Sequence, residues 1–318
     1  MEFQKYVSIE NDYNKKEYEG ILERNQELYN CKYIVQEKIH GANFSIYITK
    51  DTVHYAKRTD FIKVDESFYN WREAVNRDNI KTVINRMQQF VNLYKLDSVI
   101  LYGELYGDKI QHGVSYSPET NIKFFDMKVN GGYIGQDDFI HIFNLLDLQN
   151  EIVPIIGIYD SLEKALSIDT KFNSILGGKD KINNICEGIV IKPYELPEYT
   201  IKSGRMFYLK KKNSAFSEKK RIKKKVSIEP TDKGKQLKEI FMGYVNENRI
   251  QSVFSKYGEI SSYSQIPDYC QNIYNDAKED FLKEYKDEII LLNSNDNKHV
   301  FNIKGYINAL LRDILQKK

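Results

Sequence analysis

The alternation of apolar and polar positions divides the chain into two parts with different periods. In the first part, short runs with a period of two recur, and successive side chains of such a run point to opposite faces of a β-strand. These runs lie at 33–38, 44–48, 53–57, 98–107, 122–129, 152–159, 187–192 and 206–213. Between them, apolar residues spaced three and four apart predict amphipathic helices at 65–96, 137–148 and 161–168.

After Pro230 the period is helical to the end of the chain. A run of lysine and arginine at 219–225 precedes this change, and such runs are usually solvated linkers. The sequence therefore predicts an α+β first domain, residues 1–226, with strands and flanking helices. A small all-α domain, residues 227–318, is expected to follow.

Composition and charge exclude several classes of protein. The chain has 318 residues, is 41% hydrophobic and 29% charged, and carries a formal net charge of +2, as an ordinary globular protein does. Cys31, Cys186 and Cys270 lie far apart without C-x-x-C spacing, so we expect no zinc site, no disulfide framework and a reducing, cytoplasmic location. No stretch of about 18 apolar residues predicts a membrane span. Because the net charge is close to zero, evidence for a nucleic-acid partner must come from local clusters of charge.

The stretch from residue 33 to residue 48 carries the first candidate chemistry. An apolar strand ends in Glu37 and Lys38, Gly41 breaks the backbone, and a second alternating strand follows. A lysine between two strands, with a glycine three residues later that lets backbone come close to a bound group, suits a lysine that acts on a phosphate. The K-x-x-G string alone is a weak signal.

The wider string E-K-I-H-G-x-N-F resembles motif I of the RNA ligase 2 family, the bacteriophage and trypanosome-editing type of ATP-dependent polynucleotide ligase. Further strings resemble the later motifs of this family in the expected order. They are L-Y-G-E at 101–104, Q-H-G-V-x-Y at 111–116, F-D at 125–126, E-G-I-V-I-K at 187–192 and L-K-K-K at 209–212. The resemblance covers residues 30 to 225 and implies a nucleotidyltransferase domain with ATP-grasp-like antiparallel sheets.

Three of the charged positions are informative by themselves. Glu104 ends an apolar strand, where a carboxylate is costly to bury, so it is either a member of an ion pair or an acid that faces a ligand. Lys210 and Lys212 are two apart and lie on one strand face, with Lys211 on the other. Two such cations repel each other unless an anion such as a triphosphate lies between them, although a solvated lysine face is the alternative.

Alternation also makes a prediction for the strand at 187–192. It places Glu187 on one face together with Ile189 and Ile191. It places Val190 and Lys192 on the opposite face.

The resemblance implies a reaction in three steps. Lys38 attacks ATP and releases pyrophosphate, which leaves AMP bonded to the lysine. The 5′-phosphate of an RNA end then takes the AMP, and a 3′-hydroxyl displaces it to join the ends. A lysine with its reference pKa of about 10.4 is protonated at neutral pH, so we expect Lys210, Lys212 and a bound metal to lower the pKa of Lys38. Mg²⁺, or Mn²⁺ in its place, would be held by Glu104 and Glu187 through water.

The resemblance also implies the other contacts of the nucleotide and of the RNA. Glu37 and the Ile39 backbone would recognise the adenine edge, Phe125 would stack on its face, and Glu104 would contact the ribose. His40 occupies the position where DNA ligases and capping enzymes carry Asp, although a histidine in a turn is more often structural. Asn43 and Arg58 would serve the RNA end, and a solvated loop charge is the alternative for Arg58. The remaining candidates of the nucleotide site are Gly41, Val190 and Lys192.

Two other functions fit parts of the sequence. A DNA ligase or a capping guanylyltransferase shares the lysine and the fold, but the usual second domain of both is a β-barrel, which the helical pattern after Pro230 argues against. A non-catalytic RNA-binding protein that kept the fold is a more distant alternative. We therefore expect a monomeric RNA ligase that acts on RNA ends, chiefly at nicks in duplex RNA, with a helical domain that positions those ends.

Overall fold

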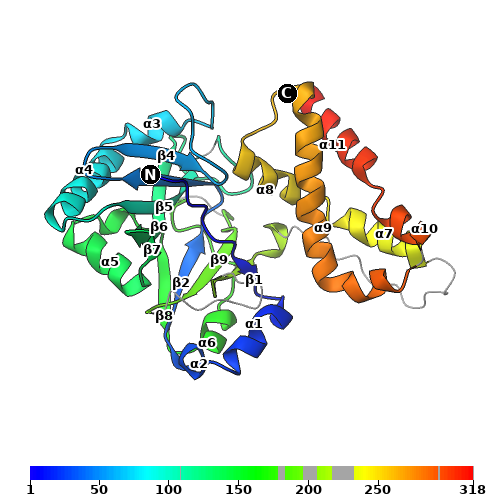
Figure 1. Ribbon diagram of the computed structural model, residues 1–318, viewed down its shortest axis with the longest axis horizontal. Helices are drawn as coiled ribbons and strands as arrows, with labels where there is room; N and C mark the ends of the chain where they lie inside the picture. The colour runs from blue at the N-terminus through cyan, green and yellow to red at the C-terminus, as the bar shows by residue number, and fades with distance from the viewer. Residues whose placement is uncertain (108, 178–182, 196–205, 217–232, 293, 318) are drawn as a thin grey trace. The chain divides into compact units, whose positions relative to one another are not determined.

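The computed structural model describes residues 1–107, 109–177, 183–195, 206–216, 233–292 and 294–317 (Figure 1). The chain forms two compact units, residues 1–216 and residues 217–318. The predicted boundary between residues 226 and 227 lies outside the described residues, so this boundary stays a prediction.

The first sheet of unit 1 has five strands in the order β1-β10-β9-β2-β8 (Figure 1). Their bounds are Glu10–Asn11 for β1, Leu209–Lys212 for β10, Gly188–Pro193 for β9, Tyr33–Lys38 for β2 and Ile155–Tyr159 for β8. All neighbours are antiparallel except β1, which runs parallel to β10 and so departs from the predicted antiparallel arrangement. Helices α1 (Lys15–Leu22), α2 (Gln26–Asn30) and α6 (Leu162–Ser167) contribute to a core cluster on one face of this sheet.

The second sheet of unit 1 has the order β4-β3-β5-β6-β7 and is antiparallel throughout. Its strands are β4 (Val53–Lys57), β3 (Ala42–Ile48), β5 (Val99–Tyr106), β6 (Asn121–Val129) and β7 (Gly132–Tyr133). One face packs into the largest core cluster with α3 (Trp71–Val75), α4 (Asp78–Leu93) and α5 (Gln136–Leu145). Two short 3-10 helices, η1 (Gln149–Glu151) and η2 (Ser214–Phe216), complete the described elements of unit 1.

The N-terminal segment packs in a separate core cluster of unit 1. Tyr6 is buried there against Tyr102 of the second sheet and Tyr208, the residue that precedes β10 in the first sheet. Since the cluster contains side chains of both sheets, the first residues of the chain help to hold the two sheets against each other. The sequence pattern gave no indication of this role.

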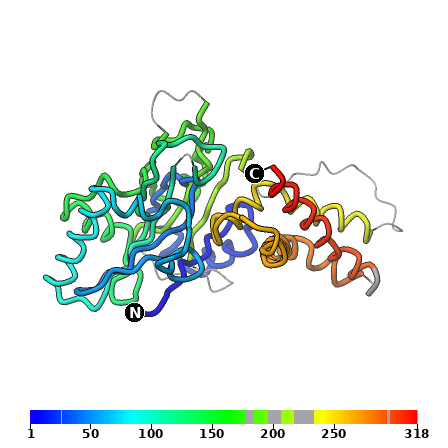
Figure 2. The backbone as a smooth tube through the Cα atoms, turned by 90° about the horizontal axis from the view of Figure 1, so that it is seen from above, coloured from blue at the N-terminus to red at the C-terminus, as the bar shows by residue number. Residues whose placement is uncertain are grey.

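Unit 2 is helical over its described residues, which contain no strand, and this confirms the predicted all-α part (Figure 2). Its elements are α7 (Lys233–Gly243), α8 (Glu247–Tyr257), η4 (Tyr263–Gln265), α9 (Ile266–Ile290), α10 (Ser294–Val300) and α11 (Lys304–Gln316). Apolar side chains at helical spacing from these helices form one core cluster, with Phe241, Ile273 and Phe281 fully buried in it.

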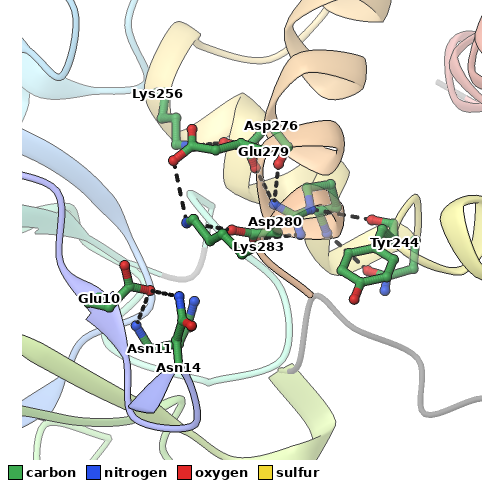
Figure 3. A network of polar contacts seen from close by, with 11 residues as sticks. Glu10, Asn11, Asn14, Tyr244, Lys256, Asp276, Glu279, Asp280 and Lys283 are labelled. Atoms are coloured by element: carbon green, nitrogen blue, oxygen red, sulfur yellow. Dashed lines mark hydrogen bonds and ion pairs between the residues drawn. The ribbon is translucent and has the colours of Figure 1, made fainter. Parts of the chain in front are cut away.

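A buried guanidinium ties α8 to the middle of α9 through Asp276 and Asp280, which are labelled in Figure 3. Arg249 is only 2% exposed, and its Nη1 and Nη2 lie 2.5 Å from Asp276 Oδ2 and 2.9 Å from Asp280 Oδ2. Its Nε also donates to the Tyr244 carbonyl at 3.3 Å. Lys256 reaches the other oxygen of Asp276 at 2.6 Å. Paired in this way, the buried charge fixes the two helices against each other.

None of the helices within the described residues combines the length with the hydropathy that crossing a bilayer requires. The three cysteines are free thiols.

Candidate functional site

Two of the predicted lysines lie on either side of one glycine. Lys38, the last residue of β2, is the ladder partner of Gly188 in β9, and Gly188 is in turn the ladder partner of Lys212 in β10. Directly paired residues of neighbouring strands project to the same face of a sheet. The glycine therefore leaves open the space between the two lysine side chains.

Glu187 is the carboxylate on which the basic side chains of the site converge. The Nζ of Lys38 lies 2.7 Å from Oε2, and the Nζ of Lys212 lies 3.1 Å from Oε1. Nδ1 of His40 lies 3.3 Å from Oε2. Burial alone would raise the pKa of Glu187, but Lys38, Lys212 and His40 outweigh it and hold the pKa well below its ordinary value. Glu187 is therefore ionised at neutral pH.

The prediction that Glu187 shares a face with Ile189 and Ile191 is wrong. Ile189 and Ile191 pack in the core with α1 and α6, whereas Glu187 contacts the lysines opposite Gly188. The strand begins only at Gly188, whose φ is +155°, and a Cβ there would lie 2.2 Å from the Lys211 carbonyl oxygen. Alternation therefore does not extend back to Glu187.

The lysines of β10 alternate as predicted. Lys211 points to the other face, where its Nζ donates to the carbonyls of Leu166 at 2.7 Å and Ile168 at 2.8 Å. Lys210 is the ladder partner of Val190 in β9 and lies two residues before Lys212, on the face of the site.

Gly41 permits a close approach of backbone, but the backbone that approaches is that of β5. A Cβ at Gly41 would lie 2.3 Å from the Leu105 carbonyl oxygen and 2.9 Å from Cγ of Glu104. The motif I turn is therefore packed directly against the strand that carries Glu104. Asn43 is the ladder partner of Glu104, which places both residues on one face of the second sheet.

Glu104 is a carboxylate with a raised pKa. Burial raises the pKa of Glu104 to about 7, the negative charge of Glu187 adds to this effect, and Lys38 and Arg58 oppose it. Glu104 forms no ion pair among the described residues, and its role as an acid that faces a ligand stays a prediction. Perturbed carboxyl groups of this kind are typical of functional sites.

The two aromatic residues of β6 differ in environment. Phe124 is fully buried in the core, whereas Phe125 is only partly buried. The β5–β6 ladder pairs Tyr102 with Asp126 and Gly103 with Phe124, so Phe125 is the extra residue of a β-bulge. At this bulge the Phe125 ring is only half-buried and packs edge-on against Tyr6, with 5.0 Å between the ring centres, so stacking on a base stays a prediction.

Lys192 has a buried carboxylate as its partner. Its Nζ lies 2.8 Å from Asp126 Oδ2, and both side chains are at most 1% exposed. The same Nζ donates to the Phe125 carbonyl at 2.8 Å, and Gln136 donates to that carbonyl and to Asp126 at 3.2 and 2.5 Å. Tyr6 donates its hydroxyl proton to Asp126 as well. In this structure Lys192 thus fixes the backbone of Phe125, and a direct nucleotide contact stays a prediction.

Glu37 lies on the face of β2 opposite to Lys38. It is buried, and its two oxygens accept hydrogen bonds from the Ser174 hydroxyl at 2.6 Å and the Ile175 amide at 2.9 Å. Burial raises the pKa of Glu37, and these hydrogen bonds oppose the rise. Ile39 follows with its side chain in the core. Recognition of the adenine edge by Glu37 and the Ile39 backbone stays a prediction.

Arg58 is packed against the N-terminal segment and is not a solvated loop charge. Its Nη2 donates to the Val7 carbonyl at 3.1 Å, and its guanidinium lies 5.6 Å from the ring centre of Tyr6. Burial lowers the pKa of Arg58, and nearby Tyr6 and Glu104 are among the groups that oppose this shift. The charge of Arg58 also opposes the rise in the pKa of Glu104, and a contact of Arg58 with a phosphate stays a prediction.

His40 is held by the Q-H-G-V-x-Y segment. Its Nε2 lies 3.0 Å from the His112 carbonyl oxygen, and its backbone amide donates to the Tyr116 hydroxyl at 2.8 Å. Because Nε2 donates to a carbonyl, Nδ1 is directed at Glu187, and it donates to that carboxylate when the imidazole carries a second proton. The Q-H-G-V-x-Y segment therefore orients the histidine of the E-K-I-H-G-x-N-F segment.

The carboxylates of the site suit a magnesium ion that is shared with a substrate. Among the described residues, no group of three or more histidine, cysteine, aspartate or glutamate side chains forms a metal cage. Mg²⁺ usually keeps several waters and is bound by one or two carboxylates together with substrate phosphates. Glu104 and Glu187, close enough to affect each other's pKa, meet that requirement.

Sequence reasoning missed the polar partners that lie between the two sheets. Asp126, Tyr6 and Gln136 hold Lys192 and the Phe125 backbone, although the sequence assigned no role to Tyr6 or Gln136. The Asp of the F-D pair was the available signal, because an aspartate in an apolar strand needs a buried partner.

Two family models match successive parts of the chain. The family model described as RNA ligase matches residues 32–223, and the one described as T4 RNA ligase 2 C-terminal matches residues 228–309. The mitochondrial RNA-editing ligase 2 of Trypanosoma brucei brucei is 23% identical over 99% of this chain and 93% of its own length. RNA-editing ligase 1 of the same organism is 22% identical, over 82% of this chain and 72% of its own.

Among solved structures, a mutant of Naegleria gruberi RNA ligase with ATP and Mn is 17% identical, with a TM-score of 0.49. The match covers 68% of this chain and 58% of that one. This chain thus spans less than two thirds of the length of that solved chain.

Proposed function

This chain belongs to the RNA ligase family, as its sequence predicted, and we propose that it is an ATP-dependent RNA ligase of the RNA ligase 2 type. Its reaction would join a 3′-hydroxyl to a 5′-phosphate through AMP bonded to Lys38. The observation that carries the proposal is the convergence of Lys38, Lys212 and His40 on Glu187, beside a glycine that leaves the site open.

In the first step, Nζ of Lys38 attacks the α-phosphorus of ATP, a P–N bond forms, and pyrophosphate leaves. Lys38 attacks as a free amine, so it must lose a proton and its contact with Glu187. The positive charges of Lys210 and Lys212 favour that loss and also offset the charge of the phosphates. When bound, the metal offsets further phosphate charge, and Glu104 and Glu187 would hold it through water.

Two displacements at phosphorus complete the reaction. An oxygen of the RNA 5′-phosphate attacks the adenylate phosphorus and breaks the bond to Lys38. The 3′-hydroxyl oxygen then attacks the 5′-phosphorus, and AMP leaves as the strand is closed. Asn43 lies beside Glu104, and Arg58 acts on that carboxyl electrostatically, which supports our proposal that both residues serve the RNA end.

The adenine would lie against Phe125, the half-buried extra residue of the bulge in β6. Stacking of a base on one aromatic ring contributes about 1 to 3 kcal/mol. Glu37 and the Ile39 backbone would contact the edge of the base, and Gly41 and Val190 would line its site.

The helical unit would position RNA ends, and the substrate would be a nick in duplex RNA. A β-barrel second domain, as expected for a DNA ligase or a capping enzyme, is not what the described residues from 233 to 317 form. The match of residues 228–309 to the T4 RNA ligase 2 C-terminal model supports the RNA ligase instead. Action as a monomer in the cytoplasm belongs to the same proposal.

Nicked duplexes with RNA and DNA exchanged on each side of the nick test this function. We expect the protein to take label from α-labelled ATP but not from α-labelled GTP, and to seal the all-RNA nick. Transfer of label from GTP would indicate a capping enzyme, and sealing of the all-DNA nick alone would indicate a DNA ligase. Binding of RNA with no label on the protein would indicate a non-catalytic RNA-binding protein.

A further inference from the structure

A groove of about 450 Å³ opens on the surface of unit 2, between the start of α9 and one face of α11. This volume is within the range of small-molecule sites. The residues that line it are Tyr263, Ile266, Pro267, Cys270, Gln271, Lys304, Asn308 and Arg312. The roles described so far use none of them.

The α11 side of the groove is a polar stripe. Lys304, Asn308 and Arg312 are four residues apart, so they lie above one another along one face of the helix. The Nζ of Lys304 donates to Gln271 Oε1 at 2.6 Å and retains further protons for a second acceptor. The stripe thus presents two cations to the groove, about 12 Å apart along the helix by the rise of 1.5 Å per residue.

Asn308, between these cations, has an unused acceptor. Its Oδ1 is buried and has no hydrogen-bond partner among the described residues. A buried acceptor without a partner costs free energy, and a native protein normally pairs such an atom. Since Asn308 lines the groove, a ligand that donates a hydrogen bond there would supply the missing partner.

The electrostatics of the groove favour an anion. Within the described part of the chain, the groove lining contains Lys304 and Arg312 but no carboxylate. Ile266 and Pro267 belong to the first turn of α9, a helix of 25 residues, whose N-terminus adds a partial positive charge. Tyr263 contributes an aromatic ring that is 57% exposed and free to stack.

We propose that this groove binds a ribonucleotide segment of the RNA substrate. Phosphates would contact Lys304 and Arg312, a base would stack on Tyr263, and a 2′-hydroxyl would donate to Oδ1 of Asn308. Phosphate, base and 2′-hydroxyl are the three parts by which proteins recognise single-stranded RNA. The inference rests on the proposed function, since it assigns a substrate contact to the helical unit of a ligase.

The cations are tested in the full-length protein with the double variant Lys304→Gln/Arg312→Gln. The matched control is Lys286→Gln/Lys298→Gln, which removes two exposed cations from the same unit outside the groove. We expect the groove variant to bind a nicked RNA duplex that carries a single-stranded RNA overhang about tenfold or more weakly, and the control to bind as the wild type does. The slope of log affinity against log salt should fall by about 1.5 for two lost phosphate contacts.

The other two contacts have their own variants. Asn308→Leu removes the unpaired oxygen, so its melting temperature should equal or exceed that of the wild type. Its ratio of RNA to DNA affinity should nevertheless fall. Tyr263→Ala should weaken RNA binding about tenfold, whereas Tyr306→Ala, which removes an exposed ring outside the groove, should leave it unchanged.

Labelling with α-labelled ATP separates failure of this inference from failure of the proposed function. We expect all these variants to form the Lys38 adenylate at the wild-type rate, while sealing falls in the groove variants alone. Equal RNA affinity and salt slope in the groove double variant and its control would overturn the groove proposal and leave the ligase proposal intact. An unchanged RNA-to-DNA ratio in Asn308→Leu would overturn the assigned 2′-hydroxyl contact. Absence of label in the wild type would instead refute the proposed function.

Discussion

The Nζ of Lys38 lies 2.7 Å from the Oε2 oxygen of Glu187, a carboxylate that is only 3% exposed. Because Lys212 reaches the other oxygen, one negative charge holds both lysines in place before any nucleotide is bound. Several consequences can be measured.

Substitution Glu187→Gln keeps the size of the side chain but leaves Lys38 and Lys212 without their shared counter-charge. We expect lysyl-adenylate formation to slow by about 10²-fold or more, as for loss of a group that positions a nucleophile. The measurement is single-turnover labelling with ATP. The matched control is Glu163→Gln on α6, which removes an exposed carboxylate remote from these lysines in the sequence and should label normally.

The raised pKa of Glu104 predicts a dependence of stability on pH. Since its folded-state pKa is about 7, against 4.5 ordinarily, the folded protein retains a proton that the unfolded chain loses. Protonated Glu104 therefore contributes fully to the free energy of unfolding below about pH 4.5. As the pH rises to about 7, this free energy falls by up to about 3 kcal/mol. In metal-free urea unfolding, Glu104→Gln should gain stability relative to the wild type between pH 5 and pH 8. If the two proteins differed in free energy of unfolding by the same amount at pH 5 and at pH 8, the raised pKa of Glu104 would be contradicted.

Ionisation of Glu104 should favour catalysis, although it lowers the stability of the fold. If ionised Glu104 helps to hold the metal, adenylate formation by the wild type should rise with pH through the region near 7. Glu104→Gln should be slow at every pH and lack this rise. A wild-type profile that is flat from pH 6 to pH 8, with chemistry rate-limiting, would show that Glu104 does not titrate in this step.

Gly188 should not tolerate a side chain. A Cβ would lie 2.2 Å from the Lys211 carbonyl oxygen and 2.8 Å from the Lys212 Cα, and its φ of +155° also disfavours alanine. We expect Gly188→Ala to destabilise the fold by about 2 kcal/mol and to abolish adenylate formation. Gly305→Ala is the control, because nothing lies within 4 Å of its Cβ position and alanine favours a helix. Thermal unfolding and ATP labelling of both variants provide the comparison.

Arg249 should be essential for the stability of unit 2. Arg249→Met leaves Asp276 and Asp280 without the guanidinium that pairs them, and loss of one member of a buried ion pair costs about 3 kcal/mol or more. Lys256→Met removes a more exposed partner of Asp276 and should cost less than about 1 kcal/mol. Urea unfolding of the two variants tests whether Arg249→Met loses more free energy of unfolding than Lys256→Met. Equal losses in the two variants would contradict this prediction.

Local periodicity was sufficient to predict the strand, turn and strand around Lys38 and the alternation of Lys210, Lys211 and Lys212. These features depend on residues that are close in the sequence. The switch to helices after Pro230 was visible for the same reason.

Contacts between distant segments explain what was not predicted. The side chain of Glu187 turns toward Lys38 because Gly188 packs against the Lys211 carbonyl, which no pattern within 187–192 reveals. The pairing of Lys192 with Asp126 joins strands of two different sheets, and periodicity shows only that each residue faces inward.

The most direct test of the account is the site of AMP attachment. The wild-type protein is incubated with ATP and Mg²⁺ without RNA, digested, and its peptides are analysed by mass spectrometry. We predict one AMP bonded to Lys38, its loss in Lys38→Met, and its retention in Lys211→Met, whose lysine points to the opposite face. AMP on any other residue, or a Lys38→Met protein that still forms the adduct, would contradict the proposed mechanism.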